Sequence, residues 1–233
     1  MLDFVGTLVT AALMTFVVNA LVVFMDVPRA AKLVLAGLIG LWIGLAAAAG
    51  AAGWLAISEP VPVMGVFVAT PLAAAAIATA WPGSRRALLG LPMPLMIGLN
   101  TGRIFAVLFL LLAAAGRLAG PFPHFAGWGD IITGAIALPL LGLLRAEGRH
   151  TAAIHLWNAF GMADLVLAIT LGVTSAVGSP LQVFDVGVGS AAMQGLPWSF
   201  VPTVLVPLWM ILHAIIWVQL RRGAKRALRG SLA

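Results

Sequence analysis

The sequence contains no cysteine and no tyrosine, and only 9% of its 233 residues are charged. The absence of cysteine excludes a disulfide framework, a thiolate metal site and a cysteine nucleophile. The scarcity of charge excludes an ordinary soluble domain, in which about a quarter of the residues are charged. No stretch is both long enough and polar enough to form a separate soluble domain, so we expect a single domain.

Apolar residues dominate what is present: they make up 62% of the chain, and the mean hydropathy is +1.11. Apolar runs of about 18 or more residues recur along the sequence, which is the length at which a helix crosses a bilayer. We therefore predict an all-α integral membrane protein with about seven transmembrane helices. Their expected ranges are about 3–25, 32–55, 62–81, 97–118, 128–145, 152–175 and 199–221, followed by a basic tail over 222–233.

The positions of the basic residues predict the orientation of this bundle. Eleven of the thirteen Lys and Arg residues fall in the odd-numbered loops or in the tail. By the positive-inside rule this side faces the cytoplasm, which places the N-terminus outside and the C-terminus inside. The first apolar run follows Asp3 and has no basic segment before it, so we expect a membrane helix rather than a cleaved signal peptide. The expected location is a plasma membrane of the bacterial inner-membrane type.

The net charge of +6 does not point to nucleic acid as a partner. The basic residues lie at helix ends and in short loops, not on an aromatic-rich soluble face, so anionic lipid headgroups are the expected counter-charge. A homo-oligomer stays open as an alternative. Small residues on the second and fifth helices predict close helix packing; they are Gly37, Gly40, Gly44, Gly127, Gly134 and Ala137.

Two segments fit no simple helix assignment. Residues 84–97 are apolar but contain Gly90, Pro92 and Pro94, and we favour an interfacial lead-in to the fourth helix over a re-entrant piece. Residues 177–198 form the longest connection, which is glycine-rich and only mildly polar. This connection is either a lid over an opening or a loop packed on the bundle, and we favour the loop.

Polar side chains inside apolar spans are costly and therefore indicate functional positions. The predicted ligand-binding or proton-coupling residues are Arg103, Asp164, His213, Asn158, His155, Asn100 and Asn19. At a helical rise of ~1.5 Å per residue, all except Asp164 fall roughly 5–12 Å below the cytoplasmic boundary. They predict a polar pocket in the cytoplasmic half, between the first, fourth, sixth and seventh helices.

Arg103 has three interpretations. If the fourth helix begins near Ile97, its side chain can snorkel to the interface; if the helix begins near Arg86, Arg103 is deep and needs Asp164 as a partner. The third interpretation is that Arg103 attracts an anionic ligand. Asp164 points about 180° away from His155 around the sixth helix, so we do not expect a single proton relay along that helix.

Asp130 is expected at the start of the fifth helix. An acidic side chain in the first helical turn complements the helix dipole and caps free N–H groups. Trp128 beside it is expected to be an interface anchor. An outward metal or proton entry site formed with His124 is the alternative.

These residues predict transport or binding of a small polar or anionic ligand, with a proton coupled at Asp164 or His213. One alternative is a redox protein that holds a b-type haem, or a quinone, through His155 and His213. Another is a structural subunit whose polar groups only lock helices together. The P-loop, HExxH and GxSxG motifs are missing, so these signatures give no support for an ATPase, a zinc protease or a hydrolase, and no metal site is predicted.

Overall fold

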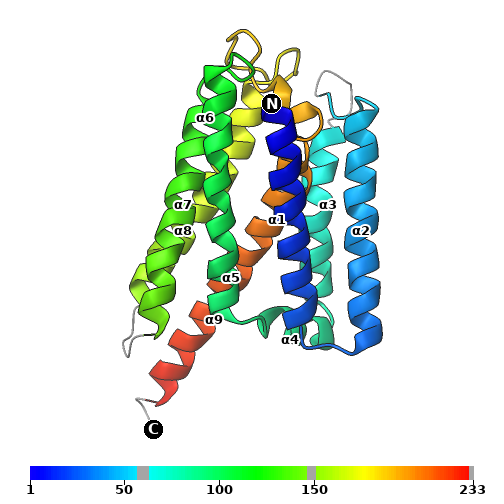
Figure 1. Ribbon diagram of the computed structural model, residues 1–233. Coiled ribbons are helices and arrows are strands. Elements are labelled where there is room, and N and C mark those ends of the chain that lie inside the picture. The colour runs from blue at the N-terminus through cyan, green and yellow to red at the C-terminus, as the bar shows by residue number, and fades with distance from the viewer. Residues whose placement is uncertain (57–62, 146–150, 231–233) are drawn as a thin grey trace.

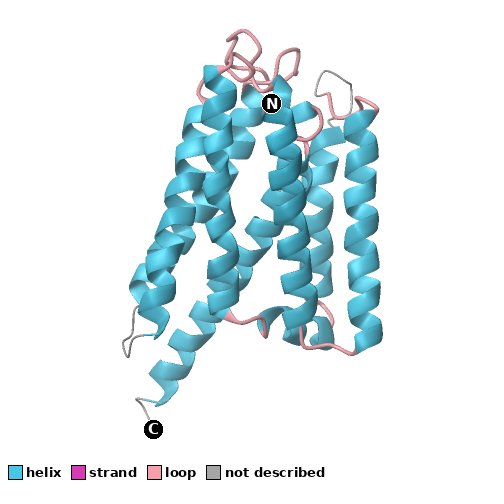
Figure 2. Ribbon diagram, in the orientation of Figure 1, coloured by secondary structure: helices cyan, strands magenta, loops and turns pink. Residues whose placement is uncertain are grey.

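The computed structural model describes residues 1–56, 63–145 and 151–230, and all of the regular secondary structure in these ranges is helical (Figure 2). The elements in chain order are α1 (Leu2–Phe24), α2 (Arg29–Ala51), α3 (Val63–Ala78), α4 (Pro82–Leu89), α5 (Met93–Leu99), η1 (Asn100–Ala106), α6 (Val107–Ala114), α7 (Phe122–Arg145), α8 (Thr151–Thr174), η2 (Ala191–Gln194), η3 (Val201–Leu205) and α9 (Val206–Gly230).

The helices confirm a multi-pass membrane protein. In the described ranges, six helical stretches are long and apolar enough to cross a bilayer, and a seventh is obtained if α3 and α4 count as one span bent by 112°. Because lipid must surround these spans, exposed apolar side chains such as Phe4 and Leu156 on the outside of the bundle are expected.

Several helix ends differ from the prediction. The fourth span runs continuously through α5, η1 and α6, from Met93 to Ala114, instead of over 97–118. Helix α7 begins at Phe122 instead of near 128. Pro123 explains this earlier start, because a proline in the first turn of a helix lacks an N–H group that would be unpaired there anyway. Helix α9 continues through the predicted basic tail to Gly230.

The helices run side by side with their ends gathered at two opposite ends of the bundle (Figure 1). The end at which α1 begins is called the N-terminal end here, and it also holds the α6–α7 and α8–α9 connections. The opposite end holds α4, which carries Arg85 and Arg86, and the exposed Arg221 and Arg222 of α9 lie toward it. That this basic end faces the cytoplasm stays a prediction.

The 84–97 segment forms α4, a break at Gly90–Pro92 and the start of α5. The side chain of Gln219 in α9 donates hydrogen bonds to the carbonyl oxygens of Leu89 and Leu91, at 3.0 and 2.8 Å. These bonds satisfy backbone acceptors that the break leaves without a helical donor. Helix α4 lies across the end of the bundle rather than along it (Figure 1), which favours the interfacial lead-in.

A π-helical segment, η3, opens the last span, and a tryptophan from α2 completes its hydrogen bonding. Pro207 has no N–H group, so it cannot donate to the carbonyl oxygen of Thr203 four residues earlier. The indole Nε1 of Trp42 donates to that oxygen instead, at 3.0 Å. The bond ties the α1–α2 hairpin to the start of α9.

Replacing Trp42 with phenylalanine should lower the free energy of unfolding by about 1–3 kcal/mol, because the buried Thr203 carbonyl then loses a donor. Reversible unfolding in mixed micelles measures the change. Trp54→Phe is the matched control, since Trp54 is 63% exposed. Equal effects of the two substitutions would contradict the assigned role of the Trp42 hydrogen bond.

Small residues bring α7 close to the fourth span, as predicted. A Cβ atom at Gly134 would lie 2.9 Å from the backbone nitrogen of Ile104, and one at Gly127 would lie 3.0 Å from Leu110. The prediction for α2 is wrong within the described chain, because a Cβ atom at Gly37, Gly40 or Gly44 would meet nothing within 4 Å.

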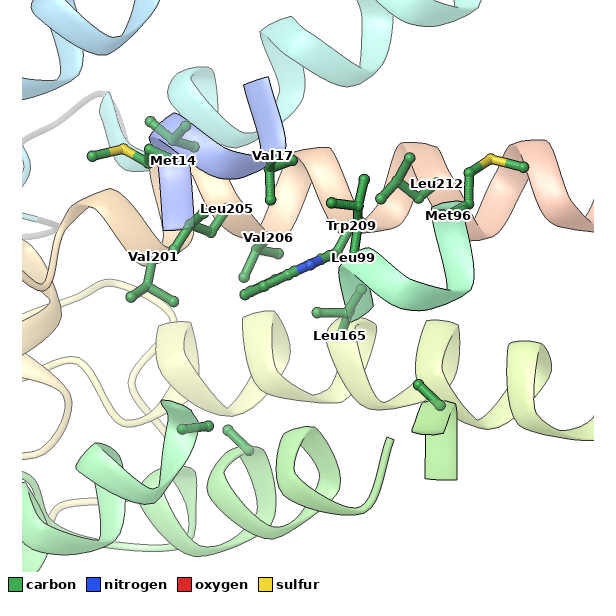
Figure 3. Packing of buried hydrophobic residues seen from close by; sticks show 14 of the residues in the cluster. Met14, Val17, Met96, Leu99, Leu165, Val201, Leu205, Val206, Trp209 and Leu212 are labelled. Carbon is green, nitrogen blue, oxygen red and sulfur yellow. The ribbon is translucent and has the colours of Figure 1, made fainter. Parts of the chain in front are cut away.

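The apolar core extends along α9 (Figure 3). Trp209 points from α9 toward α8, where Leu165 lies beside its ring, and Leu99 approaches from α5. The core therefore joins the fourth, sixth and last spans around the level of Arg103, whose guanidinium carbon lies 5.9 Å from the Trp209 ring centroid.

Candidate functional site

Arg103 is completely buried in the middle of η1, and all three of its guanidinium nitrogens have protein partners. Its Nε donates to Oδ1 of Asp130 at 2.5 Å, and its Nη2 donates to Oδ2 of Asp164 at 2.6 Å. Its Nη1 donates to the carbonyl oxygen of Gly161 at 3.2 Å. The arginine thus holds α7 and α8 against the fourth span.

His213 of α9 completes the group through both ring nitrogens. Its Nε2 lies 3.0 Å from Nη1 of Arg103, and because arginine has only donors, Nε2 must accept. Its Nδ1 therefore carries the hydrogen and donates to Oδ1 of Asn158 at 2.8 Å. Asn158 in turn donates through Nδ2 to the backbone oxygen of His213 at 3.1 Å. This pairing defines a neutral histidine with one tautomer.

We call Arg103, Asp130, Asp164, Asn158 and His213 the Arg103 cluster. Its members come from η1, α7, α8 and α9, and each lies well inside its span: Arg103 is about 15 Å from the start of the span at Met93. With His213 neutral and both carboxyl groups ionised, two carboxylates face one guanidinium, and the formal charge is −1. An excess charge is costly away from water, so the cluster favours uptake of a proton or a cation.

Two glycines make room for the cluster on the helices that carry it. A Cβ atom at Gly161 would lie 2.6 Å from Cε1 of His213 and 2.9 Å from Cγ2 of Thr133. A Cβ atom at Gly129 would overlap the carboxylate of Asp164. The backbones of α7 and α8 can therefore approach Asp164 and His213 only because these positions lack a side chain.

The structure corrects the snorkelling interpretation of Arg103 and confirms its pairing with Asp164. Asp130 was expected to be a helix cap, and that expectation is wrong, because α7 begins at Phe122 and Asp130 lies in its third turn. Asp130 is the cluster member that the sequence analysis did not place in the pocket. Pro123 was the available signal, since it indicates the earlier helix start.

The other predicted pocket residues lie outside the cluster. Asn19 is exposed on α1 and donates to the carbonyl of Thr15. Asn100 is buried and donates to the carbonyl of Met96, and its Oδ1 has no partner among the described residues. His155 is half-buried and packs edge-on against Trp217, with the two ring centroids 5.7 Å apart. The predicted pocket in the cytoplasmic half with the first helix as one wall is therefore replaced by a mid-span cluster.

This geometry does not support haem ligation by His155 and His213. Both ring nitrogens of His213 have protein partners, so neither is available for iron in this arrangement. His155 lies outside the cluster, against Trp217. Within residues 1–56, 63–145 and 151–230, no group of three or more His, Asp or Glu side chains could hold a metal ion.

A cavity of about 430 Å³, the roofed cavity, lies in the N-terminal half of the bundle. Asp130 is part of its lining, about 12 Å from the start of α7. Oδ1 of Asp130 binds Arg103, while Oδ2 has no hydrogen-bond partner among the described residues. The surrounding walls are mostly apolar and come chiefly from α3, α8 and η3; examples are Val68, Ala69, Leu72, Ile169 and Val201.

The 177–198 segment forms the roof of this cavity. Ser179, Leu181 and Met193 are among its lining residues. The segment is fixed to the C-terminal end of α8 and the residue after it: Ser190 donates from Oγ to the carbonyl of Gly172 at 2.6 Å and from its backbone nitrogen to the carbonyl of Ser175 at 3.1 Å. The favoured prediction of a loop packed on the bundle agrees with these bonds, and the loop also covers the cavity.

A second hollow, the α7–α8 groove, has a volume of about 500 Å³ and lies between these two helices. Asp164 is part of its lining, together with His124, Trp128 and Ala163. The side chain of Asp164 is 5% exposed, and its Oδ1 has no hydrogen-bond partner among the described residues. The two carboxylates that share Arg103 thus line two different hollows.

No curated protein and no solved structure matches the chain. One family model does match, over residues 60–221, which include α3 and every residue of the Arg103 cluster. The α1–α2 hairpin lies before the matched region. The chain belongs to the family described as "Domain of unknown function (DUF8737)".

Proposed function

We propose that the protein binds a small amphipathic molecule in the roofed cavity. The observation that carries this proposal is a mostly apolar cavity whose lining includes one carboxylate of a buried charged cluster. Ligand sites are typically apolar hollows of this size with a few polar groups that orient the ligand. The apolar body of the ligand packs between α3 and α8, and its polar group lies next to Asp130.

The polar group is a cation or a hydrogen-bond donor. Arg103 has no nitrogen without a protein partner, so it offers little to an anionic ligand. Asp130 keeps one oxygen without a partner among the described residues, and a carboxylate oxygen can only accept. A cationic ligand also offsets the formal charge of −1 on the cluster. This narrows the predicted ligand, which was a small polar or anionic molecule, to one that carries a cation or a hydrogen-bond donor.

A structural role for the Arg103 cluster is the competing proposal. Its supporting observation is that protein atoms from α7, α8 and α9 already pair with the arginine. In that case the polar groups join four helical segments and the cavity binds nothing specifically. The two proposals differ in one respect: only the first makes Asp130 necessary for ligand affinity.

The membrane and the orientation belong to the same proposal. We place the protein in a plasma membrane of the bacterial type with the N-terminal end outside, on the strength of the positive-inside distribution of Lys and Arg. The roofed cavity then lies in the outer half of the membrane. Transport of the ligand stays a prediction, and binding does not require it.

Octylamine and octanoate, matched in chain length, test the proposed ligand class. In lipid nanodiscs near neutral pH, octylamine should raise the midpoint of thermal unfolding and octanoate should not. At a ligand concentration of about 100 times Kd, the stabilisation is about 2.7 kcal/mol. Octanol, which is neutral and can donate one hydrogen bond, separates the need for a charge from the need for a donor.

Substitutions in the lining of the roofed cavity test whether octylamine binds there. Asp130→Asn should remove the effect of octylamine, and Ala69→Phe should do so by filling the cavity from α3. Ala74→Phe is the matched control, because Ala74 is exposed on the same helix and is not in the cavity lining. If octylamine stabilises the Asp130 variant as much as the unchanged protein, the ligand proposal fails and the structural role stands.

A further inference from the structure

Asp164 and Asp130 share one guanidinium but line separate hollows. Asp130 is in the lining of the roofed cavity, and Asp164 is in the lining of the α7–α8 groove. Asp164 is buried, and its Oδ1 has no partner among the described residues although its Oδ2 receives a hydrogen bond from Arg103. Gly129, which has no side chain, is also in the groove lining and lies against this carboxylate. A buried carboxylate with an available oxygen therefore lies at the base of the groove.

We propose that Asp164 is a proton-exchange site that is reached from the N-terminal end through the α7–α8 groove. His124 lies at the outer part of this groove, close to the start of α7. Along the helix axis it is about 7.5 Å nearer the N-terminal end than Gly129, where the carboxylate lies. Its imidazole is exposed, so it places a hydrogen-bonding group at the N-terminal end of the groove.

The exchange moves one proton from water to Oδ1 of Asp164 and changes the formal charge of the cluster from −1 to 0. Four titratable or charged groups face this region: Arg103 from η1, Asp130 and His124 from α7, and His213 from α9. His213 does not compete for the proton in this arrangement, because its Nε2 accepts from Arg103. Arg103 keeps the carboxylate of Asp130 as its ionised partner after Asp164 is neutralised.

Protonation of Asp164 should also affect binding of the ligand in the roofed cavity; this consequence rests on the proposed function. A cation next to Asp130 and a proton on Asp164 both offset the same negative charge through one shared guanidinium. Each should therefore weaken the binding of the other, and linkage requires the two effects to be equal in size. Proton exchange itself needs no ligand, so it can be tested alone.

Dicyclohexylcarbodiimide, an apolar reagent, tests the proton site directly. A protonated carboxyl group adds across a C=N bond of the reagent, and the adduct is found by mass spectrometry of peptides. In vesicles without any added ligand, we expect the label on Asp164 in preference to Asp130. Lowering the pH on the N-terminal side should increase the labelling, and lowering it on the other side should not.

Ala163→Phe, which places a ring in the groove without altering the cluster, should remove most of the label. Ala152→Phe is the control, because it lies on the same face of α8, about three turns away and outside the groove lining. Labelling unchanged by Ala163→Phe, label on Asp130 instead, no label, or a response only to pH on the opposite side would each overturn the proposal. Octylamine binding can fail while this labelling succeeds, so the two proposals are separable.

Discussion

Replacing Arg103 with methionine should destabilise the protein more than any other single substitution at the cluster. The change leaves Asp130 and Asp164 buried without the cation that receives both of them. Breaking a buried ion pair by removing one partner typically costs 3–5 kcal/mol, and about this loss is expected here. Reversible unfolding in mixed micelles, or the yield of folded protein in membranes, measures it.

The decisive control removes the charges together. In the combination of Arg103→Met, Asp130→Asn and Asp164→Asn, no uncompensated charge remains, so much of the lost stability should return. The stability of the Arg103→Lys variant should lie between that of the unchanged protein and that of Arg103→Met. An ammonium group keeps the positive charge but cannot reproduce the separate bonds from Nε and Nη2. If the triple variant is no more stable than Arg103→Met alone, the stabilisation does not come from charge pairing.

Gly161→Ala should also impair the protein strongly, by steric rather than electrostatic means. The added methyl group would lie 2.6 Å from Cε1 and 2.8 Å from Nε2 of His213. The histidine ring must then move, which disturbs its bonds to Arg103 and Asn158. Inserting a methyl group into a packed core typically costs 1–3 kcal/mol, and the loss of the ring's hydrogen bonds adds to it.

Gly40→Ala is the matched control in α2, because a Cβ atom there meets nothing within 4 Å. This substitution should be neutral or slightly stabilising, since alanine favours a helix over glycine by roughly 0.5–1 kcal/mol. The unfolding midpoint should therefore fall for Gly161→Ala and stay the same or rise slightly for Gly40→Ala. If Gly40→Ala lowers the unfolding midpoint as much as Gly161→Ala does, the steric explanation is contradicted.

Hydropathy and loop charges were sufficient to predict the class of fold, because the bilayer imposes one length on every span. They also identified Arg103 and Asp164 as unusual, since a charge inside a span must find a partner. The depth of Arg103 required the correct helix start. With the span beginning at Met93, its guanidinium meets partners on three other helices, α7, α8 and α9, and snorkelling is unnecessary.

Asp130 shows why the rest could not be predicted. Moving the start of α7 from 128 to Phe122 changes Asp130 from a first-turn residue into a buried partner of Arg103. The 3₁₀ segment η1 and the π-helical segment η3 further shift which residues face the interior, and a regular period of 3.6 residues does not show such shifts. The cavities depend on these local irregularities and on the roof segment, so they could not be predicted from the sequence.

The order of residues in the Arg103 cluster has a consequence for biosynthesis. Arg103 precedes Asp130 by 27 residues, Asp164 by 61 and His213 by 110. Arg103 is therefore made before any of its side-chain partners. Its guanidinium can be fully paired only after α7, α8 and α9 have also been made and have packed against the Met93–Ala114 span.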